Sequence, residues 1–212
     1  MSALTFAVLD ARAEPFAAVP TLSFRVRITD DSGERVHAIA LHTQLRIEPQ
    51  RRGYSNGEQD QLLELFGEPR RFGETLKPML WTHVSVMVPE FYESVEVDIP
   101  VTCTYDFEVS ASKYLSALQD GAIPVILLFS GTIFRYREGG FAVEQVPWEL
   151  DASYRLPVAA WRDVMNRYFP NSAWLRLHKD TFDELYLFKA KHALPSWESA
   201  ISALLESAKE TS

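Results

Sequence analysis

The sequence has a single cysteine, Cys103, among its 212 residues. One cysteine excludes an intramolecular disulfide, so the apolar core must hold the fold together. A chain of this length buries enough apolar surface to be stable without disulfides. Cys103 stands on the apolar side of an alternating stretch, where a free cysteine ordinarily serves as a small buried hydrophobic residue. We therefore expect Cys103 to be structural and not a catalytic thiol.

Long hydrophobic runs are missing as well. No stretch approaches the roughly 20 apolar residues that span a bilayer, and residues 1–15 lack the basic and apolar regions of a secretory signal. We therefore expect a cytoplasmic protein without a membrane span. The chain has 21 basic and 29 acidic residues and a formal net charge of −8. Because this charge repels phosphate backbones, we expect no nucleic-acid partner.

The motifs of common reaction types are absent too. The five histidines show no HExxH spacing and have no cysteine partners, so no zinc site is indicated. Neither a GxSxG nucleophile motif nor a glycine-rich phosphate loop occurs. Paired carboxylates for glycoside hydrolysis stay open, because the fold and not the sequence spacing brings them together. We expect no enzymatic activity, no catalytic residue, no metal site and no cofactor.

What the chain does have is an alternation of apolar and polar residues, the period of a β-strand with one buried face. Residues 95–109, VEVDIPVTCTYDFEV, carry an apolar residue at every odd position. Residues 22–29, 39–48 and 81–88 show the same period, and residues 6–13 are expected to form an edge strand. Turn sequences such as DDSG and REGG connect several of these stretches.

A continuous apolar run at residues 125–129 indicates a strand that is covered on both faces, and Gly131 is expected to mark a bulge in it. About seven or eight strands joined mostly by short turns predict an antiparallel β-sandwich or open barrel. The fold class is thus α+β and mainly β, with a sandwich domain at residues 1–153.

After Tyr154 the apolar period changes from 2 to 3.6, which predicts helices. One helix is expected to begin at Pro157, a second near Asp180 and a third at Ser196. Three short helices rich in aromatic residues cannot bury their apolar stripes alone. We therefore expect residues 154–212 to form a C-terminal helical segment packed on the sandwich.

Residues 49–78 interrupt the strand pattern with arginine, glycine, asparagine and proline, and only residues 59–66 resemble a short helix. Connections this long are uncommon in compact domains and are either functional or mobile. This one carries two arginine doublets, which are either a solvated loop or a contact for an acidic protein surface. The arginines, taken as candidate partner-binding residues, are Arg51, Arg52, Arg70 and Arg71.

The polar side of residues 95–109 carries four carboxylates: Glu96, Asp98, Asp106 and Glu108. They form two pairs that are too far apart for one ion, and a straight strand does not converge the six to eight oxygens that calcium needs. Arginines on the polar sides of other strands offer cross-strand partners instead. We therefore predict a solvated, charge-paired face and not a metal site.

The five tryptophans stand beside expected element boundaries. Each is either a core anchor or an exposed contact residue. An exposed row of them would indicate a surface for a peptide, a sugar or a protein. The tryptophans taken as candidate partner contacts are Trp81, Trp148 and Trp174.

Four segments resemble a family of actinobacterial proteins of unknown function: FAVLDARAEPFAAVPTLSFRVRI, IPVILLFSGTIF, EQVPWELDASYRLPVAAWRDVMNRYFPNSAWLRL and TFDELYLFKAKHALPSWESAISALL. The resemblance covers essentially the whole chain and carries over no catalytic residue. Members of this family are associated with gene neighbourhoods of the high-affinity nickel-iron hydrogenase, which implies an accessory or assembly factor. A protein that handled nickel or iron would need clustered Cys, His or carboxylate ligands, so the expected cargo is a polypeptide and not a metal.

The sequence thus predicts a non-enzymatic accessory protein that binds another protein, and the resemblance implies a hydrogenase subunit as that partner. Two alternatives stay open. One is a sandwich that binds a small molecule or a carbohydrate, with Trp81 or Trp148 as a stacking platform. The other is a chaperone-like holder of immature subunits. The oligomeric state and the order of the strands do not follow from the sequence.

Overall fold

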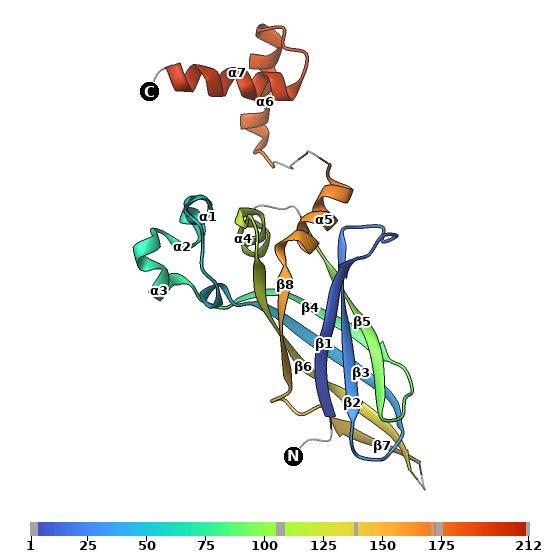
Figure 1. Cartoon of the computed structure of the whole chain (residues 1–212). Helices are drawn as coiled ribbons and strands as arrows, with labels where there is room; N and C mark the ends of the chain where they lie inside the picture. The colour runs from blue at the N-terminus through green and yellow to red at the C-terminus, as the bar shows by residue number, and fades with distance from the viewer. Residues whose placement is uncertain (1–3, 105–108, 138–139, 171, 173–175, 211–212) are drawn as a thin grey trace. The chain divides into compact units, whose positions relative to one another are not determined.

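The chain has two compact units, Met1–Ala173 and Trp174–Ser212. The first unit contains two antiparallel β-sheets and several short helices, and the second contains two helices (Figure 1). The computed structural model describes the following residues: 4–104, 109–137, 140–170, 172 and 176–210.

Sheet A has three strands in the order β1-β2-β5. These strands are β1 (Leu4–Ala13), β2 (Thr21–Asp30) and β5 (Ser94–Thr102). Alternate side chains of β2 point into the interior and are fully buried: Leu22, Phe24, Val26 and Ile28. The strands β1 and β5 form the two edges of this sheet, which confirms the edge strand expected at residues 6–13. Pro100, which has no N–H to donate, lies on the edge strand β5 as such a residue should.

Sheet B has five strands in the order β4-β3-β6-β7, and β8 also pairs with β6. They are β3 (Val36–Ile47), β4 (Met79–Val88), β6 (Ala122–Arg137), β7 (Gly140–Gln145) and β8 (Asp151–Pro157). The long strand β6 pairs with β3 on one side. On its other side the first half of β6 pairs with β8 and the second half with β7.

The two sheets face each other across one apolar core. Phe6 of sheet A stacks on Phe129 of sheet B with ring centroids 4.1 Å apart. Phe24 meets the edge of Trp81 across the same interior, at a centroid distance of 6.0 Å. The prediction of a mainly β, antiparallel sandwich with C-terminal helices is confirmed, and the sheets do not close into a barrel.

The apolar run in β6 differs from its prediction. Val125, Leu127 and Phe129 are buried between the sheets, as expected. Ile126 and Leu128 point the other way and are only half-buried, so the expectation of a strand covered on both faces is wrong. The run is apolar on its outer side because the middle strand of a sheet is flanked by neighbours that shield it partly from water.

The helices of the first unit lie at one end of the sheets and leave the broad outer faces without a covering helix (Figure 1). Residues 49–78, here called the helical lobe, contain α1, α2 and α3, and α4 follows β5. The bounds are α1 (Asn56–Gln61), α2 (Leu63–Phe66), α3 (Phe72–Thr75), α4 (Ser110–Ala117) and α5 (Val158–Tyr168), with the 3-10 turns Pro49–Arg51 and Pro69–Arg71. Among the described residues, no helix has the length and apolar character to cross a bilayer.

All three C-terminal helices are present as predicted. The helix α5 buries Trp161 and contacts β1, β2 and β8, so it belongs to the first unit. The division of the chain after Ala173 therefore differs from the boundary expected after residue 153. The second unit contains α6 (Lys179–Lys191) and α7 (Trp197–Glu210), and its packing on the sandwich stays a prediction.

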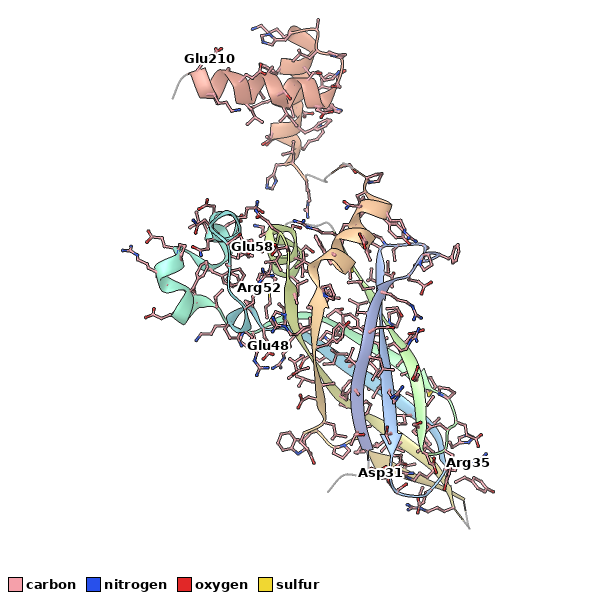
Figure 2. All side chains as sticks on the ribbon, in the orientation of Figure 1. Asp31, Arg35, Glu48, Arg52, Glu58 and Glu210 are labelled. Atoms are coloured by element: carbon pink, nitrogen blue, oxygen red, sulfur yellow. The ribbon has the colours of Figure 1, made fainter. Side chains whose placement is uncertain are left out.

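A buried carboxylate fastens the helical lobe to the rest of the first unit. One oxygen of Glu58 accepts hydrogen bonds from the Arg52 guanidinium at 2.7 Å and from the backbone N–H of Gln119 at 2.9 Å (Figure 2). The other oxygen accepts from the N–H of Ser55, whose hydroxyl accepts from the N–H of Glu58 in return. This reciprocal pair is a capping box at the start of α1. Glu58 thus ties α1 to the segment that connects α4 with β6.

Two tyrosines extend this contact. The hydroxyl of Tyr54 donates to the carbonyl of Pro49 at 2.6 Å and lies 2.9 Å from the hydroxyl of Tyr114. Since the single proton of Tyr54 goes to Pro49, the Tyr114 hydroxyl is the donor in the second bond. Burial raises the pKa of both phenols above their ordinary value, so both stay neutral and hydrogen-bonded.

The charge of Glu58 makes the attachment of the lobe sensitive to pH. Burial alone raises the pKa of this carboxyl, but the N–H groups of Gln119 and Ser55 and the Arg52 guanidinium outweigh it, and the pKa lies below its ordinary value of 4.5. A carboxyl with a lowered pKa in the folded state contributes stability that is fully present above the unfolded pKa. That contribution is lost as the pH falls through the lower, folded value.

We expect Glu58→Gln to reduce the free energy of unfolding by about 2 to 3 kcal/mol at neutral pH, because it leaves Arg52 buried without a counter-charge. As the pH falls below 4.5 the difference from wild type should shrink, since the Glu58 carboxyl of the unfolded wild-type chain then takes up a proton. Urea unfolding as a function of pH measures both. Glu74→Gln, at an exposed position of α3 in the lobe, is the control. A difference that stays constant down to pH 3 would contradict the assignment.

Glycine is required at position 131 for a reason other than the bulge expected from the sequence. Leu41 of β3 is its partner, and the pairing of β3 with β6 continues through it without a shift of register, so there is no bulge at Gly131. A Cβ atom there would stand 2.1 Å from the carbonyl oxygen of Ala40. Its φ of 143° is also one that other residues rarely adopt. Glycine is required because the two backbones approach closely.

Gly131→Ala should therefore lower the free energy of unfolding by about 3 kcal/mol, because β3 and β6 must move apart at the centre of sheet B. Gly33→Ala is the matched control: its φ of 75° is positive too, but no atom lies within 4 Å of the added Cβ. It should cost only about 1 kcal/mol. Equal losses in the two variants, measured by chemical denaturation, would show that backbone strain and not the close approach requires Gly131.

Candidate protein-binding surface

The outer side of sheet B carries a group of neighbouring positions that hold no aspartate, glutamate, lysine or arginine. Three strands contribute in register: each β3 residue is flanked by its β4 partner and its β6 partner. Side-chain contacts of 2.7 Å between His42 and Ser85 and of 3.1 Å between Gln44 and His83 place both rows on one side of the sheet. We call this group the neutral face; its members are Ala40, His42, Gln44, His83, Ser85, Met87, Leu128, Ser130 and Thr132.

Apolar residues continue the neutral face toward the β6–β7 hairpin. Phe134 of β6 pairs with Val143 of β7, and Tyr136 follows on the same side of the strand. Val143, Tyr136 and Met87 are each well over half exposed. A surface that combines exposed apolar groups with uncharged hydrogen-bonding groups has the composition of the centre of a protein–protein interface.

Sheet A presents the opposite chemistry on its outer side. Glu96 pairs with Arg27 at 2.7 Å, and Asp98 pairs with Arg12 at 3.1 Å. For these two carboxylates the prediction of a solvated, charge-paired face is confirmed. Asp106 and Glu108 lie outside the described residues. Such exposed pairs keep a sheet face hydrated and contribute little to stability, about 0 to 1 kcal/mol each.

The four candidate arginines do not act as one group. The guanidinium of Arg51 lies 2.9 Å from Glu48, and that of Arg70 lies 2.5 Å from Glu68; both arginines are exposed. Arg71 is exposed, and no carboxylate of the described residues pairs with it. Arg52 points inward to Glu58, and only 7% of its side chain is exposed. Its inward position makes it a structural residue of the lobe. That these arginines bind a partner stays a prediction.

The three candidate tryptophans also differ from one another. Trp81 is half-buried and contacts Phe24 in the core. Trp148 stands in the turn between β7 and β8, and 88% of it is exposed. Trp174 lies outside the described residues. A tryptophan exposed to this extent leaves a large apolar surface in water, and tryptophans are frequent among the residues that dominate binding energy at interfaces.

A shallow cavity of about 700 Å³ lies at the far end of the first unit, beside the β2–β3 and β4–β5 turns. Its lining is largely acidic or polar and includes Asp31, Glu93 and Tyr92. Neither Trp81 nor Trp148 lines it, so this cavity gives no support to a small-ligand site built on those two rings. Between the sheets at this end Arg135 pairs with Asp30 at 2.6 Å, and both side chains are buried.

The thiol of Cys103 lies in the core. Burial raises the pKa of Cys103 to about 12, so its thiol stays protonated at neutral pH. Within the described ranges, no three of the His, Cys, Asp and Glu side chains gather closely enough to hold a metal ion.

Sequence reasoning missed the neutral face, although its signal was present. From Ala40 to Gln44 of β3 and from His83 to Met87 of β4 the outward positions hold alanine, histidine, glutamine, serine and methionine, whereas those of β2 and β5 include arginine, glutamate and aspartate. The contrast gains meaning only once the strands are assigned to two different sheets. The pairing of Glu58 with Arg52 was missed as well, because both residues lie in a segment without strand periodicity.

Solved structures resemble the chain only slightly. The β-glucosidase from Kluyveromyces marxianus matches with a TM-score of 0.26 and 10% identity, over 73% of this chain and 15% of its own. The sporulation control protein Spo0M from Bacillus subtilis matches with a TM-score of 0.29 and 14% identity, over 74% of this chain and 49% of its own. AggA, the major subunit of aggregative adherence fimbriae type I from Escherichia coli, matches with a TM-score of 0.27 and 9% identity, over 72% of this chain and 93% of its own. Likenesses of this size carry no argument about function.

Sequence comparison gives one family. The search of curated proteins finds no match. The model of DUF6084, described as a family of unknown function, matches residues 1–212. The chain therefore belongs to the DUF6084 family.

Proposed function

We propose that this protein is a non-enzymatic accessory protein that binds another protein, with the neutral face as the centre of the contact. The observation that carries the proposal is the composition of this surface: nine neighbouring positions on three strands hold no aspartate, glutamate, lysine or arginine. Removing such a surface from water costs less than removing a charged one, because no ionised carboxylate, ammonium or guanidinium group is desolvated. Burial of the exposed apolar groups of Met87, Tyr136 and Val143 in the contact provides the favourable free energy of binding.

Charged groups stand around the neutral face and not within it. Asp151 of β8 is the partner of Leu128 of β6, and Arg46 follows Gln44 by two residues along β3. Charges at such a rim orient a partner and exclude unsuitable ones, while the uncharged centre provides most of the affinity. The exposed ring of Trp148 lies in the turn next to β8 and adds an apolar contact at the margin of sheet B.

We propose further that the partner is a subunit of a nickel-iron hydrogenase and that the protein assists its assembly in the cytoplasm of an actinobacterium. This part rests on the resemblance to a family associated with hydrogenase gene neighbourhoods. The surface suits a polypeptide as cargo, because it offers apolar, amide, hydroxyl and imidazole groups over a broad area. The buried thiol of Cys103 cannot serve as a metal ligand or nucleophile without exposure of the core.

Affinity capture from the native host with quantitative mass spectrometry tests the proposal. Ser130→Arg places a charge in the middle of the neutral face and should reduce recovery of the specific partner at least about tenfold. Thr5→Arg places the same charge on an exposed position of β1 in sheet A and should leave recovery unchanged. Equal recovery with both variants would reject the neutral face, and the absence of any hydrogenase subunit from the wild-type sample would reject the named partner.

The arginines of the helical lobe give a separate expectation. Replacing Arg51, Arg70 and Arg71 together by alanine should slow association with an acidic partner and flatten its dependence on salt, with little change in the rate of dissociation. Surface plasmon resonance between 50 and about 300 mM salt measures both rates. Lys77→Ala, another exposed basic residue near the end of the lobe, is the control for a simple change in net charge. An unchanged association rate in the triple variant would remove the lobe from the contact.

A further inference from the structure

The edge strand β4 is not protected against pairing with another strand. Sheet edges expose unpaired backbone groups, and proteins usually guard them with charges, prolines, bulges or inward-pointing ionised residues. Met79–Val88 contains no charged residue, no proline and no glycine over ten positions. Its one irregularity is a shift of register opposite Leu45 and Arg46, near its first residues. From Thr82 to Val88 the strand is regular.

The other strands at sheet edges carry the guards that β4 lacks. The strand β5 has Glu96 and Asp98 on its outer side and Pro100 in its course. The strand β1 contains a register shift between Val8 and Asp10 and lies beside β8. The strand β7 has an inward-pointing Glu144, which pairs with Arg135. The contrast within one molecule indicates that the open edge of β4 is a particular feature of this strand.

The hydrogen bonds of sheet B determine which backbone groups face outward. Glu48 donates to the carbonyl of Pro124, and Val146 donates to that of Gly131. Along a strand of an antiparallel sheet, successive residues direct their N–H and C=O groups to opposite neighbouring strands. Since Glu48, directly after β3, bonds toward β6, the even-numbered residues of β3 bond to β6 and the odd-numbered ones bond to β4. It follows that the backbone groups of three β4 residues point away from β3: His83, Ser85 and Met87.

Among the described residues, only a weak contact meets these groups. The hydroxyl of Thr82 lies 3.4 Å from the carbonyl oxygen of His83. No donor or acceptor of the described chain bonds to the outward backbone groups of Ser85 and Met87.

An apolar opening accompanies this edge. The strands β4 and β5 are consecutive and contact each other, but no ladder joins them. The inward side chains near this gap are half-buried and not fully buried: Val84 and Val86 of β4, and Val95 and Val97 of β5. The corresponding residues of the middle strands, such as Leu41 and Val26, are completely buried. The gap between the two edge strands thus leaves apolar core surface partly in contact with water.

We propose that the outer edge of β4 binds an extended segment of the partner polypeptide, which adds a strand to sheet B. The proposal rests on the proposed function and names the form in which the partner is held. The open N–H and C=O groups of Ser85 and Met87 require alternating backbone donors and acceptors at strand spacing, and an extended polypeptide provides these. The half-buried valines require apolar side chains on one face of that segment.

A segment without its own tertiary fold fits this site better than a second copy of the chain. The β4 strand of a second copy already has its valines directed into its own core, and its side chains cannot enter the gap between β4 and β5. A free segment places one set of alternate side chains over Val84 and Val86 and the other set beside the neutral face. The expected segment is therefore uncharged, free of proline and rich in β-branched residues at alternate positions.

Amide hydrogen exchange by NMR on the full chain tests the proposal. The probe is a short synthetic peptide of alternating threonine and valine, flanked by lysines for solubility. On binding, the amides of His83, Ser85 and Met87 should exchange at least about a hundredfold more slowly. Those of Val84 and Val86 are already bonded to β3 and should change little. Binding that leaves the three outward amides unprotected would overturn strand addition while leaving the proposed function intact.

Variants at Ser85 separate the backbone from the side chain. Ser85→Pro removes the outward N–H and should weaken peptide binding about tenfold. Ser85→Ala keeps the N–H, loses only the hydroxyl contact with His42, and should bind like wild type. If Ser85→Pro does not fold, Ser85→Lys provides a charged edge that keeps the backbone and should weaken binding similarly.

Two outcomes would reject the proposal directly. One is equal peptide affinity of wild type, Ser85→Pro and Ser85→Lys. The other is protection of the three outward amides that rises with protein concentration in the absence of peptide, since a second copy would then occupy the edge. Failure of the host partner to respond to Ser130→Arg concerns the neutral face, and so the proposed function, and is measured independently of these amides.

Discussion

Burial of one side of each strand between two sheets is the constraint on which the rest of this structure depends. The inward residues of β2, β3 and β6 are almost all fully buried, and contacts such as that between Phe6 and Phe129 join the two sheets. Because successive side chains alternate, this burial directs every second residue outward. The two outer faces therefore contribute little to the core, and their composition is free to serve other purposes.

The two faces have been used differently. On sheet A, cross-strand pairs such as Arg27 with Glu96 cover the outer side with charge. Exposed pairs of this kind add little to the free energy of folding, but they keep the face hydrated and oppose non-specific contact. On sheet B the neutral face holds imidazole, amide, hydroxyl and apolar groups. A face that can lose its water without stranding an ionised carboxylate, ammonium or guanidinium group is suited to a second polypeptide.

The sequence predicted the elements whose signal is local. Alternation located β2, β3 and β4, a continuous apolar run located β6, and the change of period located α5, α6 and α7. It missed β8, because Asp151–Pro157 is short and runs directly into a helix that begins after a proline. It also extended β5 to residue 109, although the ladder ends at Thr102. Alternation continues past the end of the ladder there, so the pattern by itself could not show where pairing stops.

Features that depend on strand order and distant partners could not be read from the sequence. Arg52 was grouped with the exposed Arg51, because nothing in the local pattern shows that Glu58 and the N–H of Gln119 meet beside it. The open edge of β4 depends on which strand lies at the end of sheet B, and a register change would exchange its two faces. The sequence pattern suggests a bulge at Gly131, but the reason for glycine there is a carbonyl oxygen of β3, on another strand.

The neutral face and the open edge belong to one surface, because His83, Ser85 and Met87 take part in both. Their side chains lie on the neutral face, and their backbone groups point out of the sheet edge. A strand added to β4 would enlarge the neutral face by one row. Binding at the edge of β4 would therefore extend the surface that the rest of the partner contacts. Backbone bonding at the edge tolerates many sequences, whereas the alternate side chains of the added segment meet the valines on one side and the neutral face on the other. Selectivity would then come from the pattern of the segment, and the paired backbone groups would add to the affinity that the neutral face provides.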